Sequence, residues 1–127
     1  MAQNTDSKVL RYGSILIGLA FIMSGGMKLT GPDEMVANFA RWGYPDFFIY
    51  MIGAFELAGG IGLMLPSLAG LAATGLVIIM TGAVFTHVRA GEFAQIPPSA
   101  ILLTVSALIA RARRSPVFVK LGLAKAA

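Results

Sequence analysis

The chain has no cysteine, one histidine, one tryptophan and only six acidic residues among its 127. Without cysteine it has no disulfide framework, no thiolate catalyst and no cysteine-bound zinc or iron–sulfur cluster. Charged residues make up 13% of the chain, whereas soluble domains carry about 25%. Hydrophobic residues reach 57%. Low charge together with high apolar content excludes a disordered chain and indicates an integral membrane protein.

The ten lysines and arginines outnumber the acidic residues and give a formal net charge of +4. These cations stand near the chain ends and beside apolar runs, and they form no stripe with interleaved aromatics. The basic balance therefore indicates orientation in a membrane and argues against nucleic-acid binding.

Four apolar runs predict an all-α protein, a bundle of four transmembrane helices in a single membrane domain, 1–127. A bilayer core of ~30 Å takes roughly 20 helical residues, which the first three runs reach and the fourth does not. Backbone polar groups in lipid must bond within their own segment, so these runs favour helices over open strands. The expected helices cover 10–29, 47–65, 68–88 and 96–112.

The segment 32–43, between the first two runs, predicts a short helix that lies in the membrane interface. Pro32 and the two acidic residues after it suit a first helical turn, and Gly43 would end the helix. Trp42 and Tyr44 would then lie at the level of the headgroups. The alternative is an unstructured loop.

With four spans, both ends of the chain share one side of the membrane, and that side carries most of the cations. The opposite side holds only Lys28, Arg41 and Arg89. The positive-inside rule therefore predicts a cell inner membrane protein with both termini in the cytoplasm. The seven cations on the terminal side are Lys8, Arg11, Arg111, Arg113, Arg114, Lys120 and Lys125.

Small residues recur at helical spacing in the first three runs. Such faces let helix backbones approach closely, which is what drives helix association in lipid. We therefore expect close packing along three faces. They are Ser14, Gly18 and Gly25; Gly53, Glu56 and Gly60; and Gly75, Gly82 and Thr86.

Glu56 is the most informative residue, because it is the tenth in the second run and would lie roughly 15 Å from either membrane face. A carboxylate there costs on the order of 3 kcal/mol unless it is neutral, paired or beside a wet cavity. Side chains of a helix lean toward its N-terminus. Lys28 and His87 therefore lean into the membrane from the outer ends of their helices, toward Glu56. A direct contact between Lys28 and Glu56 requires the second helix to enter the bilayer late, near Tyr50.

The polar residues have plainer interpretations as well. Glu56 and its partner would then only fix helix register, Lys28 would be a snorkelling end residue, and His87 would be interfacial. Arg89 and Glu92 are interpreted as a solvated pair. One histidine with scattered carboxylates lacks the ligand cluster of a metal site, so no metal is expected.

The segments 21–28 (FIMSGGMK) and 53–60 (GAFELAGG), the latter followed by Pro66, resemble the DoxX and DoxX-like family of small membrane proteins, as does the third run ending in Thr86 and His87. The resemblance covers about 10–110 and implies four transmembrane helices. Some family members resemble a subunit of thiosulfate:quinone oxidoreductase, others are linked to membrane oxidative-stress complexes, and distant animal relatives resemble receptor-assembly chaperones. The resemblance thus implies no single chemistry.

The first functional interpretation is binding of an apolar or amphipathic small molecule, a quinone or a lipid, as in an accessory subunit of membrane redox chemistry. Glu56 and His87 would hydrogen-bond its polar head, and Lys28 would tune their protonation. The aromatic lining would come from Phe21, Phe55 and Phe85. The alternative is a non-enzymatic scaffold or assembly protein that recruits a membrane partner or a second copy through its small-residue faces. A proton or ion pathway through Glu56 is disfavoured, because four helices make a thin channel, and no motif indicates a particular catalysed reaction.

Overall fold

The structure is a computed structural model that describes the backbone of residues 2–120 and the side chains of residues 8–113. Within the described backbone every regular element is helical. Arg114 and Lys120, by their side chains, and Lys125 altogether lie outside the described residues. The elements are α1 (Ala2–Thr30), α2 (Asp33–Arg41), α3 (Phe48–Met64), α4 (Ala69–Ala90), the 3-10 helix η1 (Phe93–Gln95) and α5 (Ile96–Lys120).

Three helical segments are long and apolar enough to cross a membrane, namely Lys8–Thr30, Ala69–Ala90 and Phe93–Arg113. The expectation that the fourth apolar run falls short of the length of a membrane span is therefore wrong, because the helix continues beyond the last apolar residues of that run. The short apolar helix is α3, whose 17 residues extend for ~25 Å. The chain is a multi-pass membrane protein, but a four-span bundle is not confirmed.

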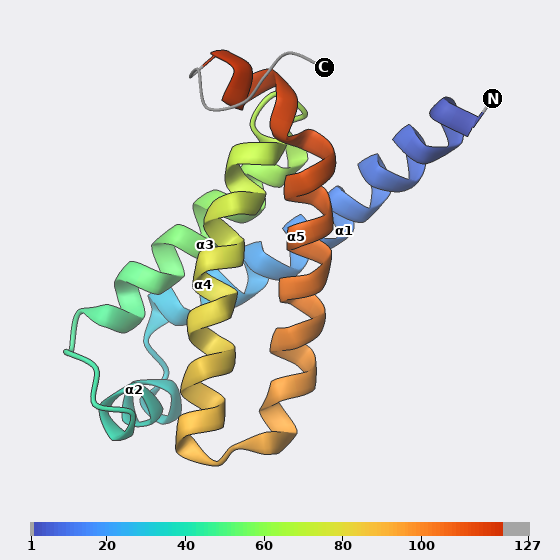
Figure 1. The fold of residues 1–127 in the computed structure, drawn as a ribbon. Helices are drawn as coiled ribbons and strands as arrows, with labels where there is room; N and C mark the ends of the chain where they lie inside the picture. The colour runs from blue at the N-terminus through green and yellow to red at the C-terminus, as the bar shows by residue number, and fades with distance from the viewer. Residues whose placement is uncertain (1, 121–127) are drawn as a thin grey trace.

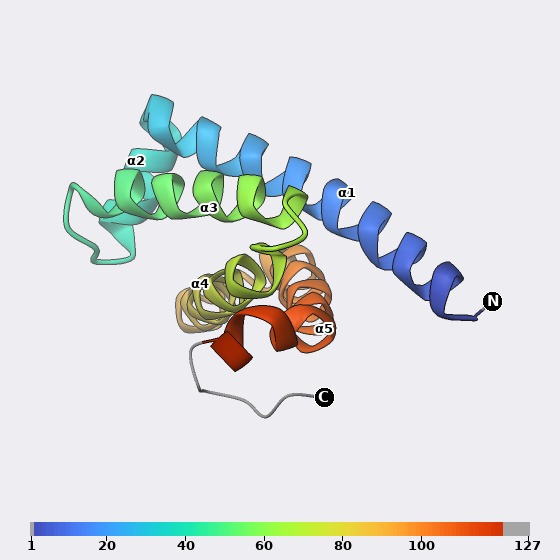
Figure 2. The same cartoon turned by 90° about the horizontal axis from the view of Figure 1, so that it is seen from above.

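The long helices form two pairs that cross each other. Figure 1 shows α1 beside α3, and α4 beside α5. In Figure 2 the first pair runs across the view while the second is seen nearly end-on, so the four helices do not lie side by side in one bundle. Phe21, Leu63, Leu76, Met80 and Ile109 form a buried apolar cluster between the two pairs.

Two glycine contacts bring α1 and α3 close together. An added Cβ on Gly18 would lie 2.7 Å from the carbonyl oxygen of Gly60, and one on Gly25 would lie 2.5 Å from that of Gly53. The spacing of seven residues is the same on both helices, and the order of the contacts makes the helices antiparallel. The expected packing along these two faces is thus observed.

The corresponding face of α4 is different. An added Cβ on Gly75 or Gly82 would meet nothing within 4 Å, and both glycines are exposed. The expectation that this face packs within the chain is therefore wrong, although its third member, Thr86, is buried.

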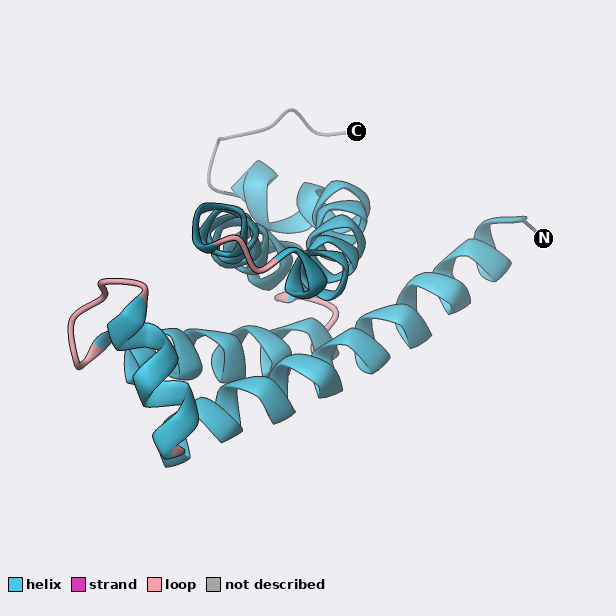
Figure 3. Ribbon diagram, turned by 90° about the horizontal axis from the view of Figure 1, so that it is seen from below, coloured by secondary structure: helices cyan, strands magenta, loops and turns pink. Residues whose placement is uncertain are grey.

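The segment between α1 and α3 is helical over Asp33–Arg41, so an unstructured loop is excluded. Phe39 is its buried residue and contacts the rings of Trp42 and Phe48. Figure 3 shows α2 lying across the end where α1 stops and α3 starts. It therefore covers one end of the space between the helix pairs.

Candidate functional site

A cavity of about 620 Å³ lies between the two helix pairs and under α2. Every α-helix contributes to its wall, so the crossing of the pairs creates it. Its wall includes Ser24, Lys28, Trp42, Tyr44, Phe55, Glu56, Ile78, Gly82, Thr86, His87 and Glu92.

Glu56 forms a buried ion pair on this wall. Its side chain is 2% exposed, and its Oε1 lies 2.7 Å from Nζ of Lys28. Lys28 also donates a hydrogen bond to Oγ of Ser24 at 2.8 Å, and Ser24 donates to Oε2 of Glu56 at 2.9 Å. The contact at Oε1 lacks hydrogen-bond geometry and acts through charge, so Ser24 supplies the directed bond.

The glycine contacts explain why this pair forms. Glu56 stands between Gly53 and Gly60 on the face of α3 that meets α1, while Ser24 and Lys28 are one turn apart on the facing helix. The close approach of Gly25 to Gly53 brings the carboxylate to the end of α1 where Lys28 lies. A direct contact between Lys28 and Glu56 is thus observed.

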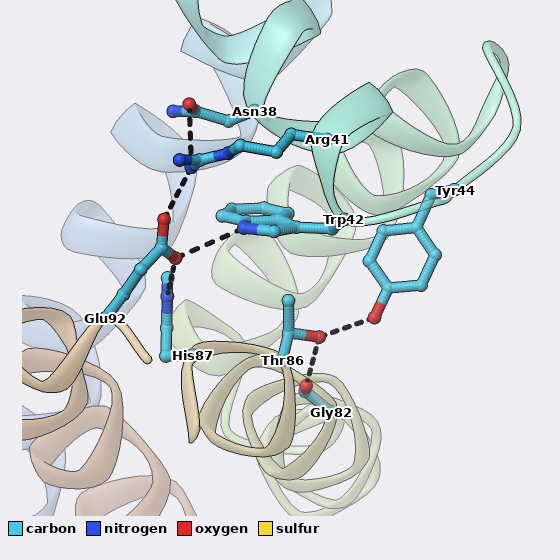
Figure 4. Close-up of polar contacts among 8 residues, drawn as sticks. All are labelled: Asn38, Arg41, Trp42, Tyr44, Gly82, Thr86, His87 and Glu92. Atoms are coloured by element: carbon cyan, nitrogen blue, oxygen red, sulfur yellow. Dashed lines mark hydrogen bonds and ion pairs between the residues drawn. The ribbon is translucent and has the colours of Figure 1, made fainter. Parts of the chain in front are cut away.

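His87 is held by a different carboxylate. Its Nδ1 lies 3.0 Å from Oε1 of Glu92, and this oxygen also accepts a hydrogen bond from Nε1 of Trp42 at 3.2 Å. Arg41, at the end of α2, donates to the other oxygen of Glu92. Figure 4 shows Glu92 receiving all three partners. His87 therefore shares the cavity with Glu56 but pairs elsewhere.

The expected pair between Arg89 and Glu92 is wrong. Nη2 of Arg89 donates to the carbonyl oxygen of Trp42 at 2.8 Å instead. Gly91 ends α4 with a left-handed φ of 74°, and the N–H of Glu92 then donates to the carbonyl oxygen of His87 at 2.9 Å. This reversal of the chain turns Glu92 back over the last turn of α4, where its carboxylate meets His87.

The surroundings of Glu92 lower its pKa below the ordinary value of 4.5. The hydrogen bond with His87 is the main cause, and the positive charge of Arg41 adds to it, while desolvation acts in the opposite direction. The carboxylate is thus ionised at neutral pH and ties α2 to α4.

Tyr44 makes a further attachment between the chain after α2 and α4. Thr86 donates its hydroxyl hydrogen to the carbonyl oxygen of Gly82 at 2.8 Å, so Tyr44 must be the donor in its contact with Thr86. Its ring stacks on Phe48 with centroids 4.6 Å apart. Together, the attachments made by Glu92 and Tyr44 close the α2 end of the cavity (Figure 4).

The three phenylalanines expected to line one pocket lie in three different places. Phe55 lines the cavity and is 56% exposed. Phe21 is fully buried in the apolar core, and Phe85 is 65% exposed outside the cavity wall. Phe21 and Phe85 thus do not line this cavity, because Phe21 packs in the core between the helix pairs and Phe85 faces outward.

Sequence reasoning missed Ser24, Trp42, Tyr44 and Glu92 as cavity residues. Sequence signals exist for two of these four residues. Ser24 is one turn before Lys28 on the same helix face, and Gly91 directly precedes Glu92 at the end of an apolar run, which is the pattern of a helix stop that folds back.

These features define a class: a small, multi-pass, all-helical membrane protein with a mostly apolar cavity that carries a few polar groups under a short capping helix. The model of the DoxX-like family matches residues 13–109, which include Ser24, Lys28, Glu56, His87 and Glu92. The chain belongs to the DoxX-like family. No curated protein and no solved structure matches this chain.

Proposed function

We propose that this protein binds an amphipathic small molecule with an uncharged polar head, a quinone or a neutral lipid, in the cavity between the helix pairs. The observation that carries the proposal is a fully buried Glu56, paired with Lys28, on the wall of a cavity that is otherwise mostly apolar. Apolar walls with a few polar groups are typical of sites for small molecules.

The charges of the wall indicate an uncharged head. Lys28 balances Glu56, and Arg41 balances Glu92, whose carboxylate also contacts the ring of His87. A ligand with a net charge would find no free counter-charge among these groups. A carbonyl or hydroxyl head, in contrast, can accept a remaining N–H of Lys28 or bond to the ring of His87.

Two exposed residues indicate how such a ligand enters. Phe55 from α3 and Ile78 from α4 both line the cavity, and they are 56% and 70% exposed. Their exposure puts the mouth of the cavity on an apolar surface of the protein. In a bilayer this mouth faces the acyl chains, which suits a ligand that is already dissolved in the membrane.

In this role Glu56 and His87 hydrogen-bond the polar head, Glu56 by accepting from a hydroxyl group, and Lys28 is the charge partner of Glu56. The protein would serve as an accessory subunit of membrane redox chemistry. We further propose that α3 is a fourth span, which brings both termini to the cytoplasmic side of an inner membrane. The cations Lys8, Arg11 and Arg113 at that end support this orientation.

The test is native mass spectrometry of the purified protein in mild detergent. We expect a retained quinone or neutral lipid, its release by Glu56→Gln, and retention in the exposed control Glu34→Gln. Gly82→Leu fills the cavity without a steric clash, since a Cβ there meets nothing within 4 Å. The matched control is Gly75→Leu, on the same open face but outside the cavity wall. Equal retention in the Gly82→Leu and Gly75→Leu variants would contradict the proposal.

The alternative function is a scaffold that binds a partner's helix, and the open face of α4 favours it. Gly75 and Gly82 have the same seven-residue spacing as the glycines that join α1 to α3, yet they have no neighbour within 4 Å. A scaffold predicts that both leucine variants lose a crosslinked partner or second copy. Ligand binding predicts an effect of Gly82→Leu alone.

A further inference from the structure

A second pocket, of about 460 Å³, lies between the first half of α1, the turn after α3 and the last part of α5. Its wall consists of Lys8, Arg11, Tyr12, Ile15, Pro66 and Arg113. None of these described wall residues is acidic. Among the described side chains, the carboxylates that form ion pairs do so with Lys28, Arg41 and His87. Three cations therefore share one space without a carboxylate partner from the described part of the chain.

The two arginines present hydrogen-bond donors to this pocket. Nη1 of Arg11 donates to the carbonyl oxygen of Met64 at 2.8 Å, which anchors the guanidinium and uses one of its five N–H groups. Nε of Arg113 is buried and has no acceptor among the described residues. A buried donor without a partner is unfavourable, and phosphate is an anion whose oxygens match a guanidinium well.

The pocket lies at membrane-surface depth. Lys8, Arg11 and Arg113 flank the apolar stretches of α1 and α5, and cations in such positions are typical of the boundary of the hydrocarbon layer. The start of α1 and the end of α5 lie toward the same end of the molecule in Figure 1, away from α2. Lysine, arginine and tyrosine are the residues expected at the level of lipid headgroups.

An exposed apolar stripe leads from the pocket into the membrane. Tyr12, Leu16, Leu19 and Met23 follow one another at helical spacing on α1, and they are 68%, 70%, 46% and 73% exposed. A free phosphate ion would use the cations but would gain nothing from this stripe. A phospholipid uses both, because its acyl chain can lie along α1.

We propose that Lys8, Arg11 and Arg113 bind the phosphate of an anionic phospholipid whose acyl chain lies along this stripe. The anionic lipids of the cytoplasmic leaflet attract such basic pockets. The site is separate from the cavity under α2 and does not depend on the function proposed for that cavity.

The experiment measures lipid retention by the full-length protein with native mass spectrometry. Phosphatidylglycerol and phosphatidylcholine of equal chain length are the two probes. We expect preferential retention of phosphatidylglycerol, weakened about fivefold by Arg113→Gln, since each cation near the surface contributes about that factor. Arg111→Gln removes the same charge from an exposed position of the same helix and should leave retention unchanged. Gly82→Leu, which fills the other cavity, should also have no effect.

Three results would overturn the proposal. Equal retention of both lipids would remove the need for a cationic site, and equal weakening by Arg113→Gln and Arg111→Gln would show only diffuse charge attraction. Displacement of phosphatidylglycerol by millimolar inorganic phosphate would show a free-anion site. Arg113→Lys keeps the charge but loses Nε, so we expect partial retention from it. It serves as the test if the glutamine variant does not fold.

Discussion

The protein contains two polar clusters of similar composition that differ in burial. We therefore expect them to contribute differently to stability. The cluster of Lys28, Ser24 and Glu56 lies between the paired helices, with the carboxylate side chain 2% exposed. The cluster around Glu92 lies beyond the end of α4, with a side chain 21% exposed. Loss of one partner from a buried pair strands a charge in a dry place, whereas water and salt replace a lost partner at the surface.

The clusters also differ in what holds them. Rigid backbone contacts between glycines fix the distance between Lys28 and Glu56. The contacts of Glu92 depend on the turn at Gly91 and on the placement of α2. The buried cluster therefore forms part of the packing between α1 and α3, and the outer cluster, around Glu92, holds α2 against the end of α4.

The largest effect is expected from removing the acid of the buried pair. Glu56→Leu leaves the ammonium of Lys28 without a partner at a site where its side chain is 16% exposed. We expect a loss of about 3–5 kcal/mol in the free energy of unfolding. Unfolding in mixed detergent, followed by circular dichroism, measures it.

The double variant Lys28→Met with Glu56→Leu is the control for this prediction. It removes both charges and should recover most of the lost stability, because paired apolar replacements of buried ion pairs are often neutral. A double variant as unstable as Glu56→Leu would mean that lost packing, and not the stranded charge, causes the effect.

The next effect tests the glycine contacts. An added Cβ on Gly25 would lie 2.5 Å from the carbonyl oxygen of Gly53, so Gly25→Ala must push α1 from α3. We expect a loss of about 1–3 kcal/mol, the usual cost of overpacking. The neighbouring Gly26→Ala meets nothing within 4 Å and should be neutral or slightly stabilising, because alanine favours helix. Equal losses from both variants would contradict the close contact.

The pairing of Lys28 with Glu56 could be predicted from the sequence because it depends on two properties of the individual helices. The cost of a carboxylate follows from its depth in an apolar run, and the lean of helical side chains follows from chain direction. Both are local properties. The packing faces at Gly25 and Gly53 were predictable for the same reason, since glycines at helical spacing mark close approach.

The other features of the site depend on how the helices pack against one another, which the periodicity of a single helix does not predict. Arg41 and Glu92 are 51 positions apart and meet only because the last residue of α2 comes close to the segment that follows α4. Phe21 and Phe85 occupy similar apolar runs, yet one is in the core and the other faces outward. The crossing of the two helix pairs, which creates the cavity, likewise follows from packing between pairs and not from any single helix.

A smaller effect is expected at the outer cluster. Glu92→Gln weakens the bonds to Arg41 and His87 but keeps the residue's shape, so α2 should stay folded and loosen from α4. We expect faster amide hydrogen exchange in Asp33–Arg41 and a fall in unfolding temperature of a few degrees at most. Glu34→Gln, an exposed change on α2 itself, should alter neither. Unchanged exchange in both variants would show that Glu92 does not fasten the helix.

The smallest effect is a pH dependence that we expect from the cluster around Glu92. The pKa of Glu92 in the folded protein is below the ordinary value of 4.5 that it regains on unfolding. Between these two values the unfolded chain binds more protons, so stability must fall as the pH drops through the window. The contribution is complete above about pH 4.5 and is lost once the pH falls through the folded pKa. Exchange of Asp33–Arg41 should therefore accelerate in acid, relative to the intrinsic rate, and Glu92→Gln should flatten this dependence. An acid response that persists in that variant would assign it to another group.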